Sequence, residues 1–104
     1  MPREKFGTLT RQMYYILLCL GEECRGIDIM DKVSDLTGGE VRVGSGTLYH
    51  LLDEFLAAGL IRETRVEGRQ RSYLITPAGR ALLEAEYRRI RRQAEDFCRV
   101  FGKE

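Results

Sequence analysis

The chain has 104 residues, with 17 basic and 16 acidic side chains and a formal net charge of +1. This length suits one domain whose core a second subunit could enlarge, and the near-neutral balance excludes a general binder of polyanions. No stretch approaches the roughly 20 apolar residues of a membrane span, and no apolar signal core is present, so we expect a cytoplasmic protein with no membrane partner.

Two helices are predicted in the first third of the chain. Apolar residues recur at helical spacing through residues 9–20, and the hydroxyl of Thr8 or Thr10 can accept an unpaired backbone N–H at the start. A second apolar stripe covers residues 29–36 and stops at Gly38-Gly39, because glycine readily takes the left-handed conformation that ends a helix. The first helix is apolar on more than one side, so we expect other elements to cover it.

The third predicted helix is the most informative segment. Ser45 is a suitable N-cap, and Gly59 supplies the stop. Thr47, Tyr49 and His50 lie on its outer face near the N-terminal end, which is the end that recognition helices present to base edges. The helix has no Arg or Lys, so specificity would need hydroxyl, imidazole or water-mediated contacts, or DNA shape. Its inner stripe consists of Leu48, Leu51, Leu52, Phe55 and Leu56.

A β-hairpin is predicted after this helix. Residues 60–66 and 71–75 are rich in β-branched and aromatic side chains, and residues 67–70 supply the turn between them. Val41 and Val43, which precede the third helix, are candidates for a further short strand. A helix followed by a hairpin of this kind is typical of a winged helix.

Basic residues gather around the hairpin. Arg69 and Arg71 suit contact with phosphates or insertion into a narrow minor groove, where the negative potential is enhanced. Arg42 stands just before the third helix and is a candidate for a backbone contact. The candidate DNA contacts are therefore Arg42, Ser45, Thr47, Tyr49, His50, Arg69 and Arg71.

A long last helix is predicted after Thr76-Pro77, because threonine caps well and proline tolerates the first helical position. Roughly 25 residues at about 1.5 Å each span about 37 Å, which is longer than a three-helix core needs. Its apolar residues alternate spacings of four and three, as in a helix that packs lengthwise on another. This seam consists of Leu83, Tyr87, Ile90, Ala94, Phe97 and Phe101, and we expect a second subunit to cover much of it.

Several short motifs in these elements occur together in one family. They are Gly46-Thr47-Leu48-Tyr49, Leu51-Leu52, Gly59-Leu60-Ile61, Gly68-Arg69, Tyr73-Leu74-Ile75-Thr76 and Gly79, preceded by Ile16-Leu17-Leu18 and Arg25-Gly26-Ile27-Asp28-Ile29. In this pattern, over roughly residues 8–101, the chain resembles the PadR family of winged helix-turn-helix transcriptional regulators. It departs from the family at Arg25 and Ile27, where aromatic residues are usual, and at His50, where a proline often follows the tyrosine.

The resemblance implies a mainly α fold with a small β-hairpin. It divides the chain into a winged helix-turn-helix DNA-binding domain at residues 1–76 and a C-terminal dimerisation helix at residues 77–104. In the family, the terminal helix of one subunit packs on the first and last helices of the other. By this resemblance the dimer interface consists of Met13, Leu17, Leu83, Tyr87, Ile90, Ala94, Phe97 and Phe101.

The function that the resemblance implies is that of a homodimeric repressor, which binds double-stranded DNA at an inverted-repeat operator. Some family members are relieved by phenolic acids or hydrophobic cationic drugs, which implies a small hydrophobic or aromatic effector here. Tyr14, Tyr15, Tyr87 and Phe97 are the candidate pocket residues, although core packing explains them equally well. The chain has no Trp, which excludes a pocket built from paired tryptophans.

Other functions stay open on the residues alone. The near-zero net charge and the acidic Asp53-Glu54 on the third helix favour a module that binds another protein. Cys19, Cys24 and Cys98 with the sole His50 suggest a thiol- or metal-responsive regulator, in which Cys24 would be exposed and reactive. Their spacing matches no metal motif, so we expect no metal and no cofactor. The sequence has no phosphate-binding loop and no recognisable catalytic arrangement, so an enzyme is not expected.

Overall fold

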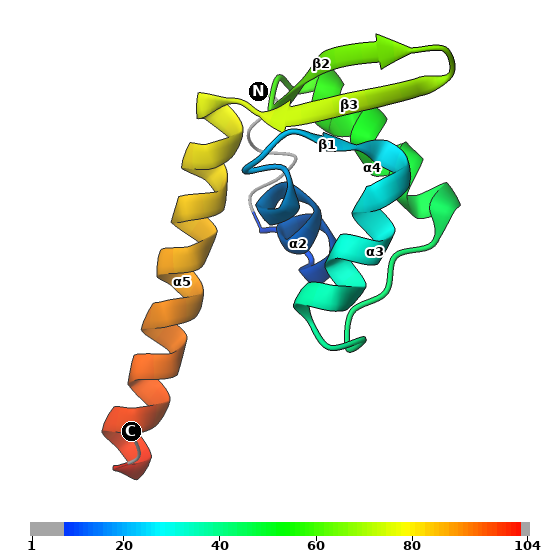
Figure 1. Ribbon diagram of the computed structural model, residues 1–104. Helices are drawn as coiled ribbons and strands as arrows, with labels where there is room; N and C mark the ends of the chain where they lie inside the picture. Colours follow the sequence, from blue (N-terminus) through cyan, green and yellow to red (C-terminus); the bar gives the residue numbers. More distant parts are fainter. Residues whose placement is uncertain (1–7, 103–104) are drawn as a thin grey trace.

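The computed structural model describes residues 8–102, so the ends of the predicted domains at residues 1 and 104 lie outside it. A helical body carries a three-stranded sheet, and one long helix leaves the body (Figure 1). The elements in chain order are α2 (Arg11–Cys19), β1 (Cys24–Arg25), α3 (Gly26–Leu36), α4 (Ser45–Ala57), β2 (Ile61–Glu67), β3 (Gln70–Ile75) and α5 (Pro77–Phe101). The predicted winged helix with a long last helix is confirmed.

The first and last of these helices begin at the predicted capping residues. The Thr10 hydroxyl accepts the Met13 N–H at 3.1 Å, and the Thr76 hydroxyl accepts the Gly79 N–H at the same distance. Pro77 occupies the first position of α5, where its missing N–H costs nothing. Local sequence therefore determines both helix starts.

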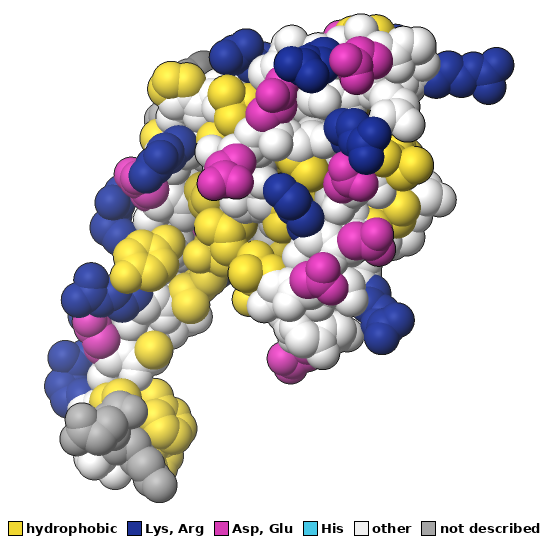
Figure 2. All heavy atoms as spheres, in the orientation of Figure 1, with side chains coloured by type: hydrophobic (Ala, Val, Ile, Leu, Met, Phe, Trp, Pro, Cys, Tyr) yellow, Lys and Arg dark blue, Asp and Glu magenta, His cyan; other side chains and the backbone are white. Residues whose placement is uncertain are grey.

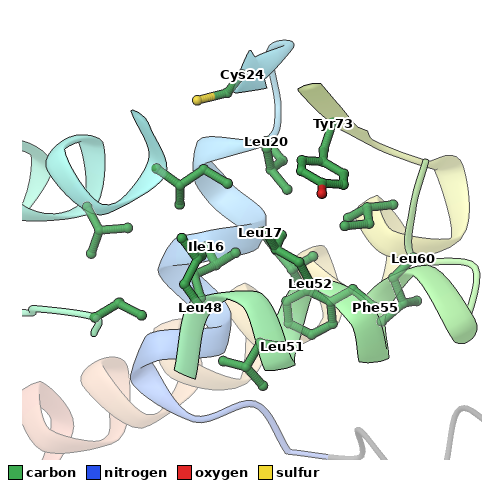
Figure 3. Close-up of a cluster of buried hydrophobic side chains, with 14 of the residues drawn as sticks. Ile16, Leu17, Leu20, Cys24, Leu48, Leu51, Leu52, Phe55, Leu60 and Tyr73 are labelled. Carbon is green, nitrogen blue, oxygen red and sulfur yellow. The ribbon is translucent and has the colours of Figure 1, made fainter. Parts of the chain in front are cut away.

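The core lies between α2 and α4, with α3 and the sheet around them (Figure 3). Leu17 corrects one prediction, since its side chain is 0% exposed within a single subunit and has no surface left for a dimer interface. The stripe predicted for the third helix faces this core, as expected. Fully buried side chains include Ile16 and Leu17 of α2, its C-cap Leu20, and Leu48, Leu52 and Phe55 of α4.

The third strand, β1, pairs with β3 on the side away from β2. Cys24 lies opposite Tyr73 in this ladder and is buried, and burial raises the pKa of its thiol. The expectation of an exposed, reactive Cys24 is therefore wrong. No strand forms at Val41 and Val43 either. Both side chains are buried in the loop before α4, where the Thr37 hydroxyl accepts the Val41 N–H at 3.0 Å.

The hairpin of β2 and β3 is the wing, and its turn is tighter than predicted. Glu67 pairs with Gln70, so the turn consists of Gly68 and Arg69 alone. Gly68 has a φ of +62°, a conformation that glycine adopts without steric cost. Arg69 consequently stands at the extreme tip of the wing.

Helix α5 begins against the body and then leaves it (Figure 1). Gly79 packs directly on the Leu60 backbone, and one turn later Leu82 and Leu83 are half-buried against the core. Glu86 is the last buried side chain of the helix. The helix then continues into solvent, and the longest dimension of the molecule is 54 Å. Within residues 8–102, no helix is long and apolar enough to cross a membrane.

Candidate nucleic-acid interface

The N-terminal end of α4 is exposed and has no side-chain cap. Gly44, not Ser45, is the N-cap, and Ser45 is the first helical residue, so the prediction that the Ser45 hydroxyl caps the helix is wrong. Residues 44–47 are all exposed, and a side chain placed at Gly44 or Gly46 would meet nothing within 4 Å. The first backbone N–H groups of α4 therefore face open space, where they and the positive end of the helix dipole favour an anion.

The outer face of α4 presents the predicted side chains. Thr47, Tyr49 and His50 are exposed, because the opposite stripe of the helix faces the core. Tyr49 is 44% exposed, and its ring also lies over the start of α3, where a Cβ at Gly26 would come within 3.3 Å of a ring carbon. Tyr49 thus has one packed face and one free face. The packing orients the ring and still leaves it accessible.

His50 has a neighbour along the helix. Its Nε2 lies 3.3 Å from an Oε2 of Glu54, one turn further on. The His50 side chain is 68% exposed. This contact holds the imidazole along the helix axis, and its nitrogens stay within reach of solvent or of a ligand on that face.

The wing arginines differ in whether an acidic side chain nearby already binds them. The Arg71 guanidinium lies 2.8 Å from the Glu63 carboxylate on the neighbouring strand, and this hydrogen bond raises the pKa of Arg71. Arg65 pairs with Glu67 at 3.7 Å. Among the residues that the structure describes, no hydrogen bond or ion pair holds Arg69, which is exposed at the tip. Arg69 is therefore available to a phosphate at the tip of the wing.

The side chain of Arg42 is less favourably placed for a DNA contact than the residues at the start of α4. Its Nε donates to the Gly39 carbonyl at 3.3 Å, so the side chain bends back over the loop between α3 and α4. Its own carbonyl accepts a hydrogen bond from the Gln12 side chain at 3.0 Å. The backbone of Arg42 therefore helps to fix the start of α4.

A groove of about 530 Å³ runs between α4, the start of α3 and the wing. It brings Tyr49 and the two predicted wing arginines together on one surface, whereas Arg42, Ser45 and Thr47 are not among its lining residues. Tyr73 also lines the groove, and burial raises the pKa of its phenol. The groove is lined by Gly26, Ile27, Tyr49, Asp53, Leu56, Glu63, Arg69, Gln70, Arg71 and Tyr73.

Comparison with known proteins identifies the family. The model of the transcriptional regulator PadR-like family matches residues 16–85, more than half of the chain. The protein belongs to the PadR-like family of transcriptional regulators. The matched range runs from α2 into the first turns of α5 and includes the whole of the groove.

Solved structures of other regulators have the same fold as this PadR-like protein. H. salinarum RosR is 27% identical, with a TM-score of 0.65 over 86% of this chain and 77% of that chain. A transcriptional regulator from Clostridium thermocellum, Cth-833, is 22% identical, with a TM-score of 0.70 over 86% and 91%. The transcriptional repressor CouR, in a structure with a 23-mer DNA duplex, is 20% identical, with a TM-score of 0.63 over 91% and 65%.

A curated relative is more similar in sequence but much longer. An uncharacterized 37.1 kDa protein in transposon TN4556 of Streptomyces fradiae is 45% identical over 62 residues, or 60% of this chain. The match covers 16% of that protein. The chain therefore spans about one sixth of the length of this relative, and the similarity concerns one segment of it.

Sequence reasoning missed Gln70, which lines the groove of this PadR-like protein, and Arg25 of β1, which contacts Gln70. Arg25 Nη1 donates to Gln70 Oε1 at 2.8 Å, and Arg25 Nε lies 2.9 Å from Asp28 Oδ2. The bond between Arg25 and Gln70 joins residues 45 positions apart and depends on the pairing of β1 with β3. No local pattern in the sequence signals that pairing.

Charge is interspersed on the face of the PadR-like protein that is seen in Figure 2. Figure 2 shows Lys and Arg alternating with Asp and Glu over the body and along α5. On the far part of α5, Arg91 pairs with Glu95 at 3.1 Å and Arg92 with Asp96 at 3.3 Å. Residues 8–102 also contain no group of three or more His, Cys, Asp or Glu placed to hold a metal ion.

Proposed function

We propose that this PadR-like regulator binds double-stranded DNA through α4 and the wing, as a homodimer that represses transcription at an inverted-repeat operator. One observation carries the DNA-binding part of the proposal. The free face of Tyr49 and the unpaired Arg69 border the same groove, and Tyr49 lies one helical turn beyond the uncapped start of α4. A helix end that favours anions and an available guanidinium together suit a phosphate backbone.

The side chains divide into those that position the protein and those that read bases. Ser45 and the first N–H groups of α4 would contact phosphate, together with Arg69 and, after release from Glu63, Arg71. Thr47, Tyr49 and His50 would reach base edges in the major groove. The side chain of Arg42 is turned toward Gly39, so Arg42 would support DNA binding through its backbone, which helps to fix the start of α4.

The dimer part of the proposal rests on the far half of α5. In the last four turns, Phe97 and Phe101 are 55% and 67% exposed, and their rings lie 4.9 Å apart on one face. Ile90 is 42% exposed, and Ala94 is also exposed. Burying a large apolar side chain contributes about 1.5–3 kcal/mol. A second subunit that covers these residues would therefore stabilise the dimer strongly. We propose residues 77–104 as the dimerisation helix and residues 1–76 as the DNA-binding domain.

The body offers a surface on which the partner helix could pack. Leu18 of α2 and Leu36 of α3 are exposed large apolar side chains, and both border a groove of about 480 Å³. Met13 on α2 is half-buried. Figure 2 shows hydrophobic side chains gathered in the angle between α5 and the body. We propose that the exposed end of the partner's α5 fills this angle.

The proposed effector site adjoins the same angle. A hollow of about 300 Å³ lies between α2 and α5, and its lining includes Tyr14, Leu83 and Tyr87. Burial raises the pKa of Tyr14, and a neutral phenol can donate a hydrogen bond. A small aromatic ligand here would separate α2 from α5, and a shift of α5 would move the two DNA-binding domains of a dimer apart. Release follows only if the ligand binds the separated state more tightly.

Selection of random duplex DNA by the purified protein tests this function. We expect enrichment of an inverted repeat whose half-sites are centred one helical turn apart, about 34 Å, or a multiple of it. Enrichment of a single, unrepeated site would contradict binding as a two-fold dimer. No enrichment would contradict sequence-specific DNA binding.

A protein-binding module is the second candidate, and the acidic side of the groove favours it. Asp53 and Glu63 line the groove beside the two arginines, so its net charge is balanced. Such a partner would be a mixed-charge peptide segment. Binding to DNA that weakens steeply with added salt would count against this candidate, because release of counterions is the mark of phosphate contacts.

A further inference from the structure

The tip of the wing extends beyond the rest of the sheet. Strand β1 has two residues and covers only Tyr73 and Ser72 of β3. Beyond Ser72, the hairpin has no neighbouring strand on that side, and Figure 1 shows it reaching past the end of β1. A two-stranded ribbon by itself is marginally stable in water, so a further contact is needed to hold its tip in a fixed position.

One side chain supplies that contact. Arg25 stands opposite Ser72, and Gln70 is therefore its diagonal neighbour on the same face of the sheet, within reach of a long side chain. Arg25 Nη1 donates to Gln70 Oε1 at 2.8 Å. Within residues 8–102, this is the one hydrogen bond or ion pair between side chains that joins residues 65–71 to elements outside the hairpin.

The other end of the guanidinium is held by α3. Arg25 Nε lies 2.9 Å from Asp28 Oδ2, in the first turn of that helix. A guanidinium is planar and rigid, so the bond to Asp28 aims Nη1 toward the wing. A lysine carries all three of its N–H donors on one nitrogen, so it could bond both acceptors only if both lay around that single atom, whereas arginine reaches them with two separate nitrogens.

We propose that Arg25 is a positioning residue that connects α3 to the wing tip and so sets the place of Arg69. Arg69 follows the turn glycine and directly precedes Gln70, so a fixed Gln70 restricts where the Arg69 side chain can reach. The effect on DNA affinity rests on the proposed function. The effect on the wing itself does not, because the contact exists in the free protein.

Amide relaxation of Gly68 in the full-length free protein tests the contact. Arg25→Ala, Arg25→Lys and Gln70→Ala should each increase the fast motion of the Gly68 amide. Gln70→Glu keeps an acceptor oxygen for Arg25, so the motion of Gly68 in this variant should equal that of the wild type. Arg62→Ala is the matched control, since it removes an exposed arginine near the base of β2. Unchanged Gly68 motion in both alanine variants would overturn the proposal.

Affinity for the DNA duplex enriched from a random pool tests the consequence. Loss of one hydrogen bond predicts that Arg25→Ala and Gln70→Ala each weaken binding about two- to tenfold, and that the double variant is no weaker than either. A loss in Arg25→Ala with none in Gln70→Ala would overturn positioning, because Arg25 would then contact DNA itself. If the wild-type protein bound no duplex, the proposed function would fail, and the motion of Gly68 would still decide whether the contact orders the wing.

Discussion

Replacement of Gly79 by alanine should destabilise the protein strongly. The new Cβ would lie 2.9 Å from the Leu60 carbonyl carbon and from Ile75 Cγ1, and closer still to the Leu60 oxygen. Backbone atoms cannot turn away as a flexible side chain can, so α5 must shift. Overpacking of this kind costs about 1–3 kcal/mol.

The shift also disturbs the hydrogen bonds that attach α5 to the body. The Thr76 N–H donates to the Leu60 carbonyl at 3.0 Å, and the Thr76 hydroxyl donates to the Gly59 carbonyl at 2.7 Å. Each such bond contributes about 0.5–1.5 kcal/mol, while alanine in a helix gains at most about 1 kcal/mol over glycine. We expect a net loss of about 2–4 kcal/mol, which lowers the melting temperature by roughly 10–25 °C.

Thermal unfolding followed by circular dichroism at one fixed protein concentration measures this loss. Gly46→Ala is the matched control, because Gly46 also lies in the first turn of a helix but a Cβ there meets nothing within 4 Å. The control should unfold at the wild-type temperature or slightly above it. If Gly79→Ala were as stable as Gly46→Ala, the close packing of α5 on the Leu60 backbone would be refuted.

Three further predictions concern assembly, DNA contact and acid stability. Ile90→Glu should give monomers by analytical ultracentrifugation, because it buries a charge in the proposed seam, whereas Arg88→Glu should stay dimeric; a dimeric Ile90→Glu would disprove this interface. Arg69→Ala should weaken binding to all duplexes and lower the salt slope, while Tyr49→Ala should weaken cognate binding most; equal losses on cognate and random DNA in both would contradict this division. The pKa of Glu86 is lowered in the folded protein, so its carboxylate stabilises the fold fully above the ordinary carboxyl range and loses this effect as the pH falls through the native pKa. Glu86→Gln should therefore have a lower free energy of unfolding in urea than wild type at neutral pH, and the two should converge in acid. A difference in the free energy of unfolding that does not change with pH would contradict that role.

The acid sensitivity predicted for Glu86 has a structural cause. Its carboxylate accepts a hydrogen bond from Arg89 Nε at 3.3 Å, and a bond from the Leu9 backbone lowers the pKa further, against the effect of burial. This carboxylate links the point where α5 leaves the body to the segment before α2. Its protonation would loosen both together.

The parts of the fold that sequence predicts are those that depend on neighbours along the chain. Thr10 and Thr76 cap their helices through atoms three residues away, and Gly68 closes a hairpin between adjacent strands. The inner stripe of α4 follows from helical spacing alone. Such features were readable because the relevant contacts are local.

The misses depend on contacts between distant segments. Cys24 is buried because β1 pairs with β3, a partner almost 50 residues away. Leu17 is buried in a core cluster that includes Leu48, Leu52 and Phe55 of α4, about 30 or more residues away in the chain. The miss at Ser45 is of another kind, because it is a local shift of one residue: α4 begins at Ser45, with Gly44 as its N-cap. In the groove, the exposed residues of α4 were predictable, and the link from Arg25 to Gln70 was not.

The most direct test of the account is the stoichiometry and salt dependence of binding to the enriched duplex, measured by fluorescence anisotropy and sedimentation. The account predicts two subunits on each duplex and an affinity that falls steeply and linearly with salt on logarithmic axes, with a slope of about −0.9 for each phosphate contacted. A single subunit on each duplex, or an affinity that does not change with salt, would contradict a dimer that grips the DNA backbone with its two wings.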